Sequence, residues 1–127
     1  MKVLITGDRH YDEVEPILWI LYGLTYHDKQ LTLVEGEAKG ADSLSREVAY
    51  HLNATFPELA IQVKKYPADW KRYGRAAGPI RNRQQFDEER PDVVIGFHNN
   101  IDSSSGTKDM LDYAKAQGAT VYLVSEW

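Results

Sequence analysis

The chain has 127 residues, of which 43% are apolar and 27% charged, with a formal net charge of −4. This balance excludes a disordered chain, and the length fits a single domain over residues 1–127 with one modest core. The sequence has no apolar run of about 18 residues to cross a membrane, no signal peptide, and no cysteine for disulfides or a thiolate zinc site. We therefore expect a cytoplasmic protein.

Short apolar runs alternate with amphipathic segments in the first half of the chain. Residues 2–6 predict a buried strand that Gly7 closes. An apolar stripe at steps of three and four residues predicts the first helix, carried by Val14, Ile17, Leu18, Leu21 and Leu24. A second strand is expected over residues 31–34 and a second helix over residues 41–52.

The same alternation continues to the end of the chain. Gly78-Pro79 fits a helix start, because a proline at the first helical position loses no needed hydrogen bond. The expected elements are a strand over 61–66, a helix from about 78 to about 90, a strand over 92–97, a helix over 106–118 and a strand over 120–124.

This order predicts an α/β fold. We expect a single Rossmann-like three-layer domain, with a mostly parallel sheet of about five strands and helices on both faces. The strands are apolar on both faces, as a covered parallel sheet requires. In such sheets ligands bind beyond the carboxyl ends of the strands.

The loops at those strand ends are rich in glycine and small polar residues. Such loops let backbone N–H groups approach an anion, and each helix start adds a favourable dipole of ~0.3–1 kcal/mol. Several starts that converge on one crevice predict a phosphate-binding site. Its candidate residues are Gly7, Arg9, Gly36, Lys39, Gly40, Asp42, Asp69, Trp70, Gly78, Arg81, Asn82, Gly106 and Thr107.

Some of these residues have a second interpretation. Gly36 and Gly40 could only shape a tight turn, and Gly106-Thr107 is a common helix start. The sequence has neither a Walker A loop nor the Gly-x-Gly-x-x-Gly fingerprint, so we expect no nicotinamide or other cofactor. The four histidines, which show no metal-ligand spacing, are interpreted as surface or loop residues: His10, His27, His51 and His98.

Several polar and aromatic side chains near helix starts could contact a ligand directly. The helix of Arg81 has little apolar stripe, and an arginine can hold phosphate through its fork of N–H donors. Trp70 could stack on a base or pack in the core. Asp42, Asp69 and Asp109 could each contact a sugar hydroxyl or act as a base. Helix capping is the competing role for Asp42 and Asp109.

Charge is unevenly distributed along the chain. Residues 64–90 hold eight Lys/Arg and four Asp/Glu, whereas the other 100 residues hold seven and fifteen. The asymmetry suggests an anionic partner, although a solvated basic helix face would look the same. Overall acidity and the lack of a recognised motif disfavour nucleic acid as that partner. The aromatic first helix could support a homodimer or contribute to the core, through Trp19, Tyr22 and Tyr26.

Five sequence blocks follow the predicted strands: 6–9, 35–42, 66–70, 74–82 and 106–110. In this order they resemble the YspA-like domains of the SLOG superfamily. That superfamily also includes the LOG phosphoribohydrolases that activate cytokinins and the Rossmann-like part of DprA. The resemblance implies a Rossmann-like sheet that binds nucleotides or nucleotide-derived molecules. It also implies that Gly36, Gly40, Gly106 and Thr107 hold phosphate, and that Arg81 and Asn82 face the ligand.

Two loops depart from the family pattern. Asp8 stands where a small hydroxyl is usual, and Glu35 and Glu37 stand where glycine or small residues are common. These carboxylates favour a ligand with sugar hydroxyls over a simple triphosphate.

The LOG enzymes carry a catalytic arginine and a glutamate in the motif Pro-Gly-Gly-x-Gly-Thr-x-x-Glu. Arg81 is the candidate match for the arginine, but the glutamate position falls on Met110. Asp109 lies one residue earlier, where the helix turns its side chain by about 100°.

We therefore expect a domain that binds or senses a nucleotide or a nucleotide-derived small molecule. The alternative is an enzyme that hydrolyses the N-glycosidic bond of a nucleoside monophosphate, with Arg81 and Asp109 as its catalytic residues. A third hypothesis is nucleic-acid binding through residues 64–90, which would weaken steeply with salt.

Overall fold

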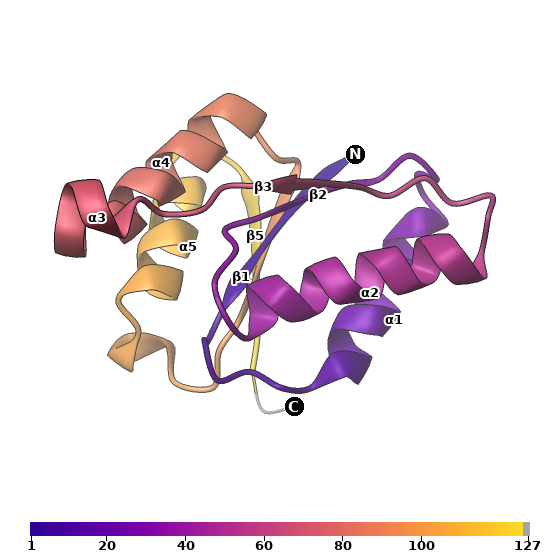
Figure 1. Ribbon diagram of the computed structural model, residues 1–127, viewed down its shortest axis with the longest axis horizontal. Helices are drawn as coiled ribbons and strands as arrows, with labels where there is room; N and C mark the ends of the chain where they lie inside the picture. Colours follow the sequence, from indigo (N-terminus) through magenta and orange to yellow (C-terminus); the bar gives the residue numbers. More distant parts are fainter. Residues whose placement is uncertain (126–127) are drawn as a thin grey trace.

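Strands and helices alternate along the chain in the computed structural model, which describes residues 1–125 (Figure 1). The elements are β1 (Lys2–Gly7), α1 (Val14–Thr25), β2 (Thr32–Glu35), α2 (Ala41–Thr55), β3 (Gln62–Lys65), α3 (Trp70–Tyr73), the 3₁₀ turn η1 (Gly74–Ala76), α4 (Ala77–Glu89), β4 (Val93–Phe97), the 3₁₀ turn η2 (Ile101–Ser103), α5 (Gly106–Ala116) and β5 (Thr120–Val124).

The five strands form one parallel sheet in the order β3-β2-β1-β4-β5, which confirms the predicted α/β arrangement. The chain moves outward from β1 to β3 and then returns to place β4 on the other side of β1. Gly7 pairs with Phe97 where these two central strands end. The loops that follow β1 and β4 lead to opposite faces of the sheet, and such a switch point leaves a crevice at the carboxyl edge.

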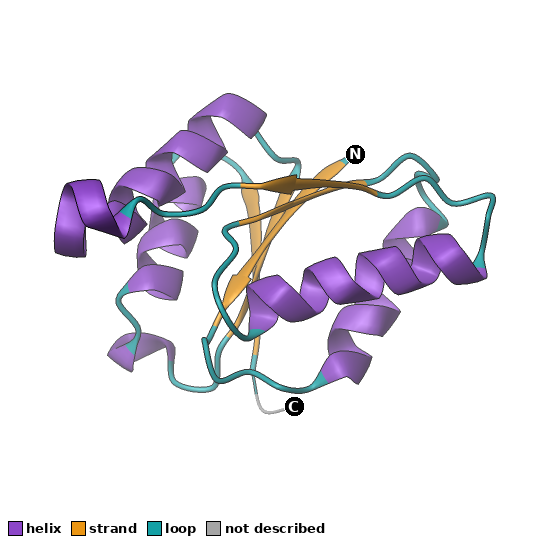
Figure 2. Ribbon diagram, viewed as in Figure 1, coloured by secondary structure: helices purple, strands orange, loops and turns teal. Residues whose placement is uncertain are grey.

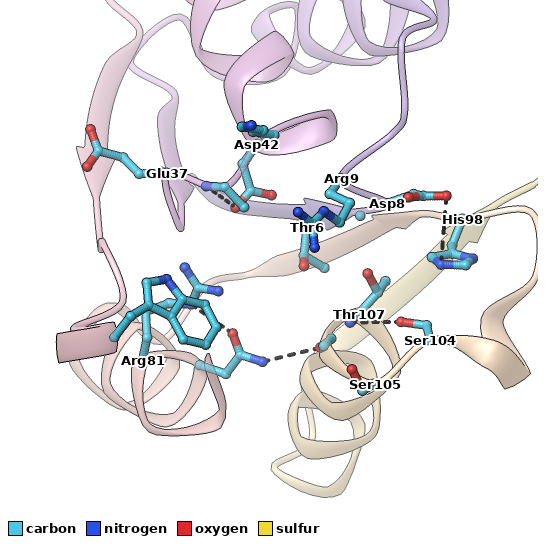
Figure 3. A pocket seen from close by; sticks show the side chains of 16 residues that line it. Thr6, Asp8, Arg9, Glu37, Asp42, Arg81, His98, Ser104, Ser105 and Thr107 are labelled. Carbon is cyan, nitrogen blue, oxygen red and sulfur yellow. Dashed lines mark hydrogen bonds and ion pairs between the residues drawn. The ribbon is translucent and has the colours of Figure 1, made fainter. Parts of the chain in front are cut away.

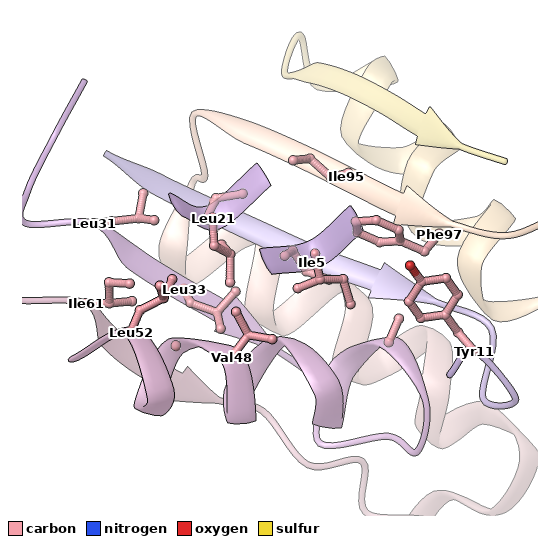
Figure 4. Close-up of a cluster of buried hydrophobic side chains, with 14 residues drawn as sticks. Ile5, Tyr11, Leu21, Leu31, Leu33, Val48, Leu52, Ile61, Ile95 and Phe97 are labelled. Carbon is pink, nitrogen blue, oxygen red and sulfur yellow. The ribbon is translucent and has the colours of Figure 1, made fainter. Parts of the chain in front are cut away.

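Helices cover both faces of the sheet (Figure 2). Val3 and Ile5 pack with α1 and α2, whereas Leu4 between them packs with α4 and α5. Because all three side chains are buried, the central strand reads as a continuous apolar run. Figure 4 shows the larger cluster, in which Leu21 of α1 and Val48 of α2 lie against the sheet. Each such side chain stabilises the fold by ~1.5–3 kcal/mol.

The two edge strands differ from the prediction. Lys64 of β3 is 45% exposed and Tyr122 of β5 is 58% exposed, so only the central strands are covered on both faces. The second and third strands occupy Thr32–Glu35 and Gln62–Lys65 rather than 31–34 and 61–66, because these are the residues that pair in register, β2 with β1 and β3 with β2.

A helical turn that the sequence analysis missed follows β3. Residues 70–76 form α3 and η1, and α4 begins at Ala77, before Gly78. Pro79 is therefore the third helical residue, which is tolerated because the first four N–H groups of a helix have no intrahelical acceptor.

The aromatic residues of α1, and Tyr26 directly after it, differ in exposure. Trp19 and Tyr26 are exposed, whereas Tyr22 contacts Phe56 with their ring centroids 5.3 Å apart. Self-association through this helix stays a prediction. Across residues 1–125, no helix combines the length and apolar character needed to span a membrane.

Candidate functional site

A pocket of about 660 Å³ opens at the carboxyl edge of the sheet, where the loops after β1 and β4 separate (Figure 3). The loops after β2 and β3 and the start of α4 complete its walls. It is lined by Thr6, Gly7, Asp8, Arg9, Glu37, Ala38, Lys39, Asp42, Trp70, Arg81, Asn82, His98, Ser104, Ser105, Gly106 and Thr107.

Two glycines allow the loops that follow β1, β2 and β4 to pack closely behind this pocket. A Cβ on Gly7 would lie 2.6 Å from the Phe97 carbonyl oxygen. Gly40 has φ of 76°, and a Cβ there would overlap the carbonyl oxygen of Asp8. Glycine is required at Gly40 because no other residue fits this conformation and this approach. Gly40 does not itself line the pocket, so its role in the structure is the tight turn.

The loop after β2 wraps around a carboxylate from the first turn of α2. Oδ2 of Asp42 accepts hydrogen bonds from the backbone N–H of Gly36 at 3.1 Å and of Ala38 at 3.3 Å. The sequence predicted that Gly36 would hold a phosphate of the ligand. Gly36 lies outside the pocket lining, where a Cβ would overlap the guanidinium of Arg81.

Arg81 joins the loops after β2 and β3 to α4. Its Nη1 donates to the carbonyl oxygens of Gly36 and Tyr66, and its Nε donates to Oδ1 of Asn82 at 3.0 Å. The guanidinium also faces Asp42. Burial raises the pKa of Asp42 to about 7, and the charge of Arg81 opposes part of that rise. Asp42 thus changes charge near neutral pH inside the pocket wall.

The amino terminus of α5 forms the opposite wall. Oγ of Ser104 accepts from the backbone N–H of Thr107 at 3.0 Å and of Lys108 at 3.3 Å, and so caps the helix. Nδ2 of Asn82 donates to the Gly106 carbonyl oxygen at 3.2 Å. This bond fixes the start of α5 against α4, and leaves Ser105, Gly106 and Thr107 on the pocket surface.

The glutamates after β2 have different environments. Glu35 is fully buried and accepts from Nη1 of Arg46 at 3.0 Å, and burial raises its pKa. Glu37 has φ of 56°, lines the pocket, and lies 3.9 Å from Arg46 and 4.0 Å from Lys65. Of these two glutamates, only Glu37 can therefore contact a ligand in the pocket.

Five predicted site residues lie outside the pocket lining: Gly36, Gly40, Asp69, Gly78 and Asp109. Oδ1 of Asp69 accepts from the N–H of Arg72 at 3.1 Å and caps α3. Gly78 lies under the indole of Trp70.

Asp109 binds Arg83 through both oxygens, at 2.9 and 3.0 Å. Its Oδ2 also accepts from Nδ2 of Asn82 at 3.1 Å. The role of Asp109 as the carboxylate of a hydrolase stays a prediction. The carboxylates that line the pocket belong to Asp8, Glu37 and Asp42.

The structure brings the other nine predicted residues together at the pocket: Gly7, Arg9, Lys39, Asp42, Trp70, Arg81, Asn82, Gly106 and Thr107. Seven further residues line the pocket that the sequence did not predict: Thr6, Asp8, Glu37, Ala38, His98, Ser104 and Ser105. The sequence did give an indication for Asp8 and Glu37, because both depart from the family pattern. His98 gave no such indication: it lies in the loop after β4, as one of the two expected placements, and its side chain is 12% exposed. Within residues 1–125, no group of three or more His, Asp or Glu is placed to hold a metal ion.

Solved DNA processing proteins share this fold. DprA from Streptococcus pneumoniae matches 99% of this chain with a TM-score of 0.71 at 17% identity. DprA from Helicobacter pylori, described as having a unique single-stranded DNA binding mode, matches 100% with a TM-score of 0.69 at 18% identity. This chain spans 50% and 66% of the lengths of those two proteins. No family model and no curated protein matches the sequence. The chain therefore shares the Rossmann-like α/β fold of these DprA structures.

The expectation that disfavoured nucleic acid as a partner is wrong. It rested on the overall acidity of the chain and on the lack of a recognised motif, yet a protein with this fold is described as binding single-stranded DNA. Net charge is a poor guide here because the charge is segregated, with the basic excess concentrated in residues 64–90.

Proposed function

We propose that the pocket binds a nucleotide or a nucleotide-derived small molecule, with its phosphate at the amino terminus of α5. The observation that carries this proposal is the opening of Ser105, Gly106 and Thr107 into a 660 Å³ pocket at the switch point of the sheet. We also assign the chain to the YspA-like domains and to the cytoplasm, on the sequence arguments given above.

The start of α5 suits an anion for two physical reasons. The helix dipole places positive potential at this end. Among residues 1–125, no acceptor is found for the backbone N–H of Ser105 or Gly106, so both N–H groups remain for a ligand. The side chains of Arg9 and Lys39 line the same pocket and add positive charge.

The mixed charge of the pocket limits the class of ligand. Three basic side chains and the carboxylates of Asp8, Glu37 and Asp42 share its lining. A bare polyphosphate would meet repulsion from these carboxylates, whereas a nucleotide also offers hydroxyl and amino groups that donate hydrogen bonds to them. The balance therefore favours a nucleotide with few phosphates.

The direct test is calorimetric titration of the protein with AMP, ribose 5-phosphate and adenosine. We expect AMP to bind at least about tenfold more tightly than adenosine, because a phosphate makes charge-assisted hydrogen bonds at the start of α5. Equal affinity for AMP and adenosine, or no binding by either, would overturn the proposal.

Single-stranded nucleic acid is the second candidate, favoured by the likeness to DprA and by the rim of the pocket. Trp70 is 60% exposed there, and it is followed by the exposed basic residues Lys71, Arg72 and Arg75. An exposed aromatic ring beside basic side chains can stack a base and hold the backbone.

This candidate is tested with an oligothymidylate and a variant in which Lys71, Arg72 and Arg75 are alanine. If the oligonucleotide binds along α3 and η1, the variant lowers the magnitude of the slope of log affinity against log salt by about two, because each phosphate contact with a single strand contributes about 0.7. Lys115→Ala, which removes an exposed charge near the far end of α5, should leave the slope unchanged. An unchanged slope in the triple variant would reject binding along α3.

A further inference from the structure

Asp8 and His98 face each other at one end of the pocket, away from Arg81 (Figure 3). They follow the neighbouring strands β1 and β4, and the N–H of Asp8 donates to the Phe97 carbonyl oxygen at 2.9 Å. Oδ2 of Asp8 lies 4.0 Å from Nε2 of His98. This separation is too long for a hydrogen bond between the two side chains.

A backbone N–H group orients each of these side chains from behind. Oδ1 of Asp8 accepts from the N–H of His10 at 2.9 Å. Nδ1 of His98 accepts from the N–H of Asn100 at 2.9 Å. In the neutral imidazole the proton is therefore on Nε2, on the side of Asp8. A donor, Nε2–H, and an acceptor, Oδ2, thus face one gap of 4.0 Å.

The group that matches this gap must accept from His98 and donate to Asp8. A hydroxyl does both, and an oxygen about 2.9 Å from each atom closes a triangle on the 4.0 Å base. An ionised phosphate oxygen has no proton for the Asp8 carboxylate. A protonated amine has no lone pair for Nε2–H.

We propose that Asp8 and His98 together bind a hydroxyl of the ligand's ribose, and so make the pocket select ribonucleotides over deoxyribonucleotides. This inference rests on the proposed function, in which the phosphate lies at the start of α5. His98, Ser104 and Thr107 all line the pocket that this helix start faces. A site built to hydrogen-bond a hydroxyl rejects an analogue that lacks it, because its own polar groups are then left without partners.

The test compares AMP with 2′-deoxy-AMP and 3′-deoxy-AMP by calorimetry on the wild-type protein. We expect one of the deoxy compounds to bind at least about tenfold more weakly than AMP. The compound that loses affinity identifies which hydroxyl lies between Asp8 and His98.

Asp8→Asn sharpens the test without a change in side-chain size. If its amide oxygen accepts from His10, the amide nitrogen faces His98, and two donors then meet where the hydroxyl needs an acceptor. The ratio of the deoxy-AMP and AMP dissociation constants should fall to near one. Asp12→Asn removes the same charge from an exposed position outside the pocket and should keep the wild-type ratio.

The outcomes separate the two proposals. AMP and both deoxy compounds bound equally well by the wild type would overturn the ribose selection and leave the phosphate site standing. A discrimination that Asp8→Asn leaves intact would assign the selection elsewhere and contradict the role of Asp8. If the wild type binds none of the three, the proposed function fails, and this inference fails with it.

Discussion

The loop between β2 and α2 and the loop between β4 and α5 carry the same sequence signal and have different structures. Each brings glycine to the start of a helix at the carboxyl edge of the sheet. In the first loop, Gly40 packs against the backbone of Asp8, and the N–H of Gly36 binds Asp42. In the second, Gly106 lies on the pocket surface, and a Cβ there would meet no atom within 4 Å.

The difference lies in what satisfies the backbone N–H groups. Near the start of α2, the carboxylate of Asp42 already takes the place of an anion. Near the start of α5, Ser104 is a neutral cap that uses the N–H groups of Thr107 and Lys108 and leaves those before them. A glycine-rich helix start therefore predicts an anion site only where the protein supplies no anion itself.

Substitution of the two glycines should give the largest contrast. Gly40→Ala should destabilise the protein by about 3 kcal/mol or more, because its backbone conformation excludes a side chain. Gly106→Ala should change the free energy of unfolding by no more than about 0.5 kcal/mol. Urea denaturation of both variants measures this contrast. Similar losses would contradict the distinction between a packed glycine and an open one.

The buried carboxylate of Asp42, which the first loop surrounds, predicts a dependence of stability on pH. The pKa of Asp42 is raised from 3.8 to about 7, so the folded state binds the proton more tightly than the unfolded state. The stability that the protonated Asp42 side chain confers is fully present below about pH 4 and is lost as the pH rises towards 7. Above pH 7 the free energy of unfolding no longer depends on this group.

Asp42→Asn removes that titration and keeps an acceptor for Gly36 and Ala38. Between pH 4 and pH 7 the variant should therefore gain stability relative to the wild type, at up to about 1.4 kcal/mol per pH unit. Urea denaturation at several pH values gives the difference. If the wild-type and variant curves run parallel over this range, Asp42 does not titrate there.

The smallest expected effect belongs to the second loop. Thr107→Val keeps the shape of the side chain and removes a hydroxyl that lines the pocket. We expect AMP to bind about five- to tenfold more weakly, the equivalent of one hydrogen bond, with the fold intact. Thr120→Val, at an exposed position of β5, is the matched control and should bind AMP as the wild type does. An unchanged affinity in Thr107→Val would remove Thr107 from the phosphate site.

The fold was predictable because its signals are local. The run Val3-Leu4-Ile5 and the helical stripes report burial directly, since each side chain meets the sheet or a helix at a regular period. The turn of α3 was not predictable from such a pattern, because a four-residue helix has no apolar period and depends on the Asp69 cap.

Site residues were predictable only where the residue type and its place at a helix start are enough to suggest contact with a ligand. Arg81 and Gly106 reach the pocket from helix starts, as expected. The pairing of Asp8 with His98 joins positions 90 residues apart, and depends on the adjacency of β1 and β4 in the sheet. Asp109 lies outside the pocket lining because its carboxylate binds Asn82 and Arg83 on the neighbouring helix.

Amide chemical-shift mapping with AMP tests the central claim most directly. The account predicts that the largest ¹H–¹⁵N shifts fall on Ser105, Gly106 and Thr107, with smaller changes at Gly36 and Ala38, whose N–H groups bind Asp42. The largest shifts at Gly36 and Ala38, with Ser105 to Thr107 unmoved, would contradict the assignment of the anion site to the start of α5.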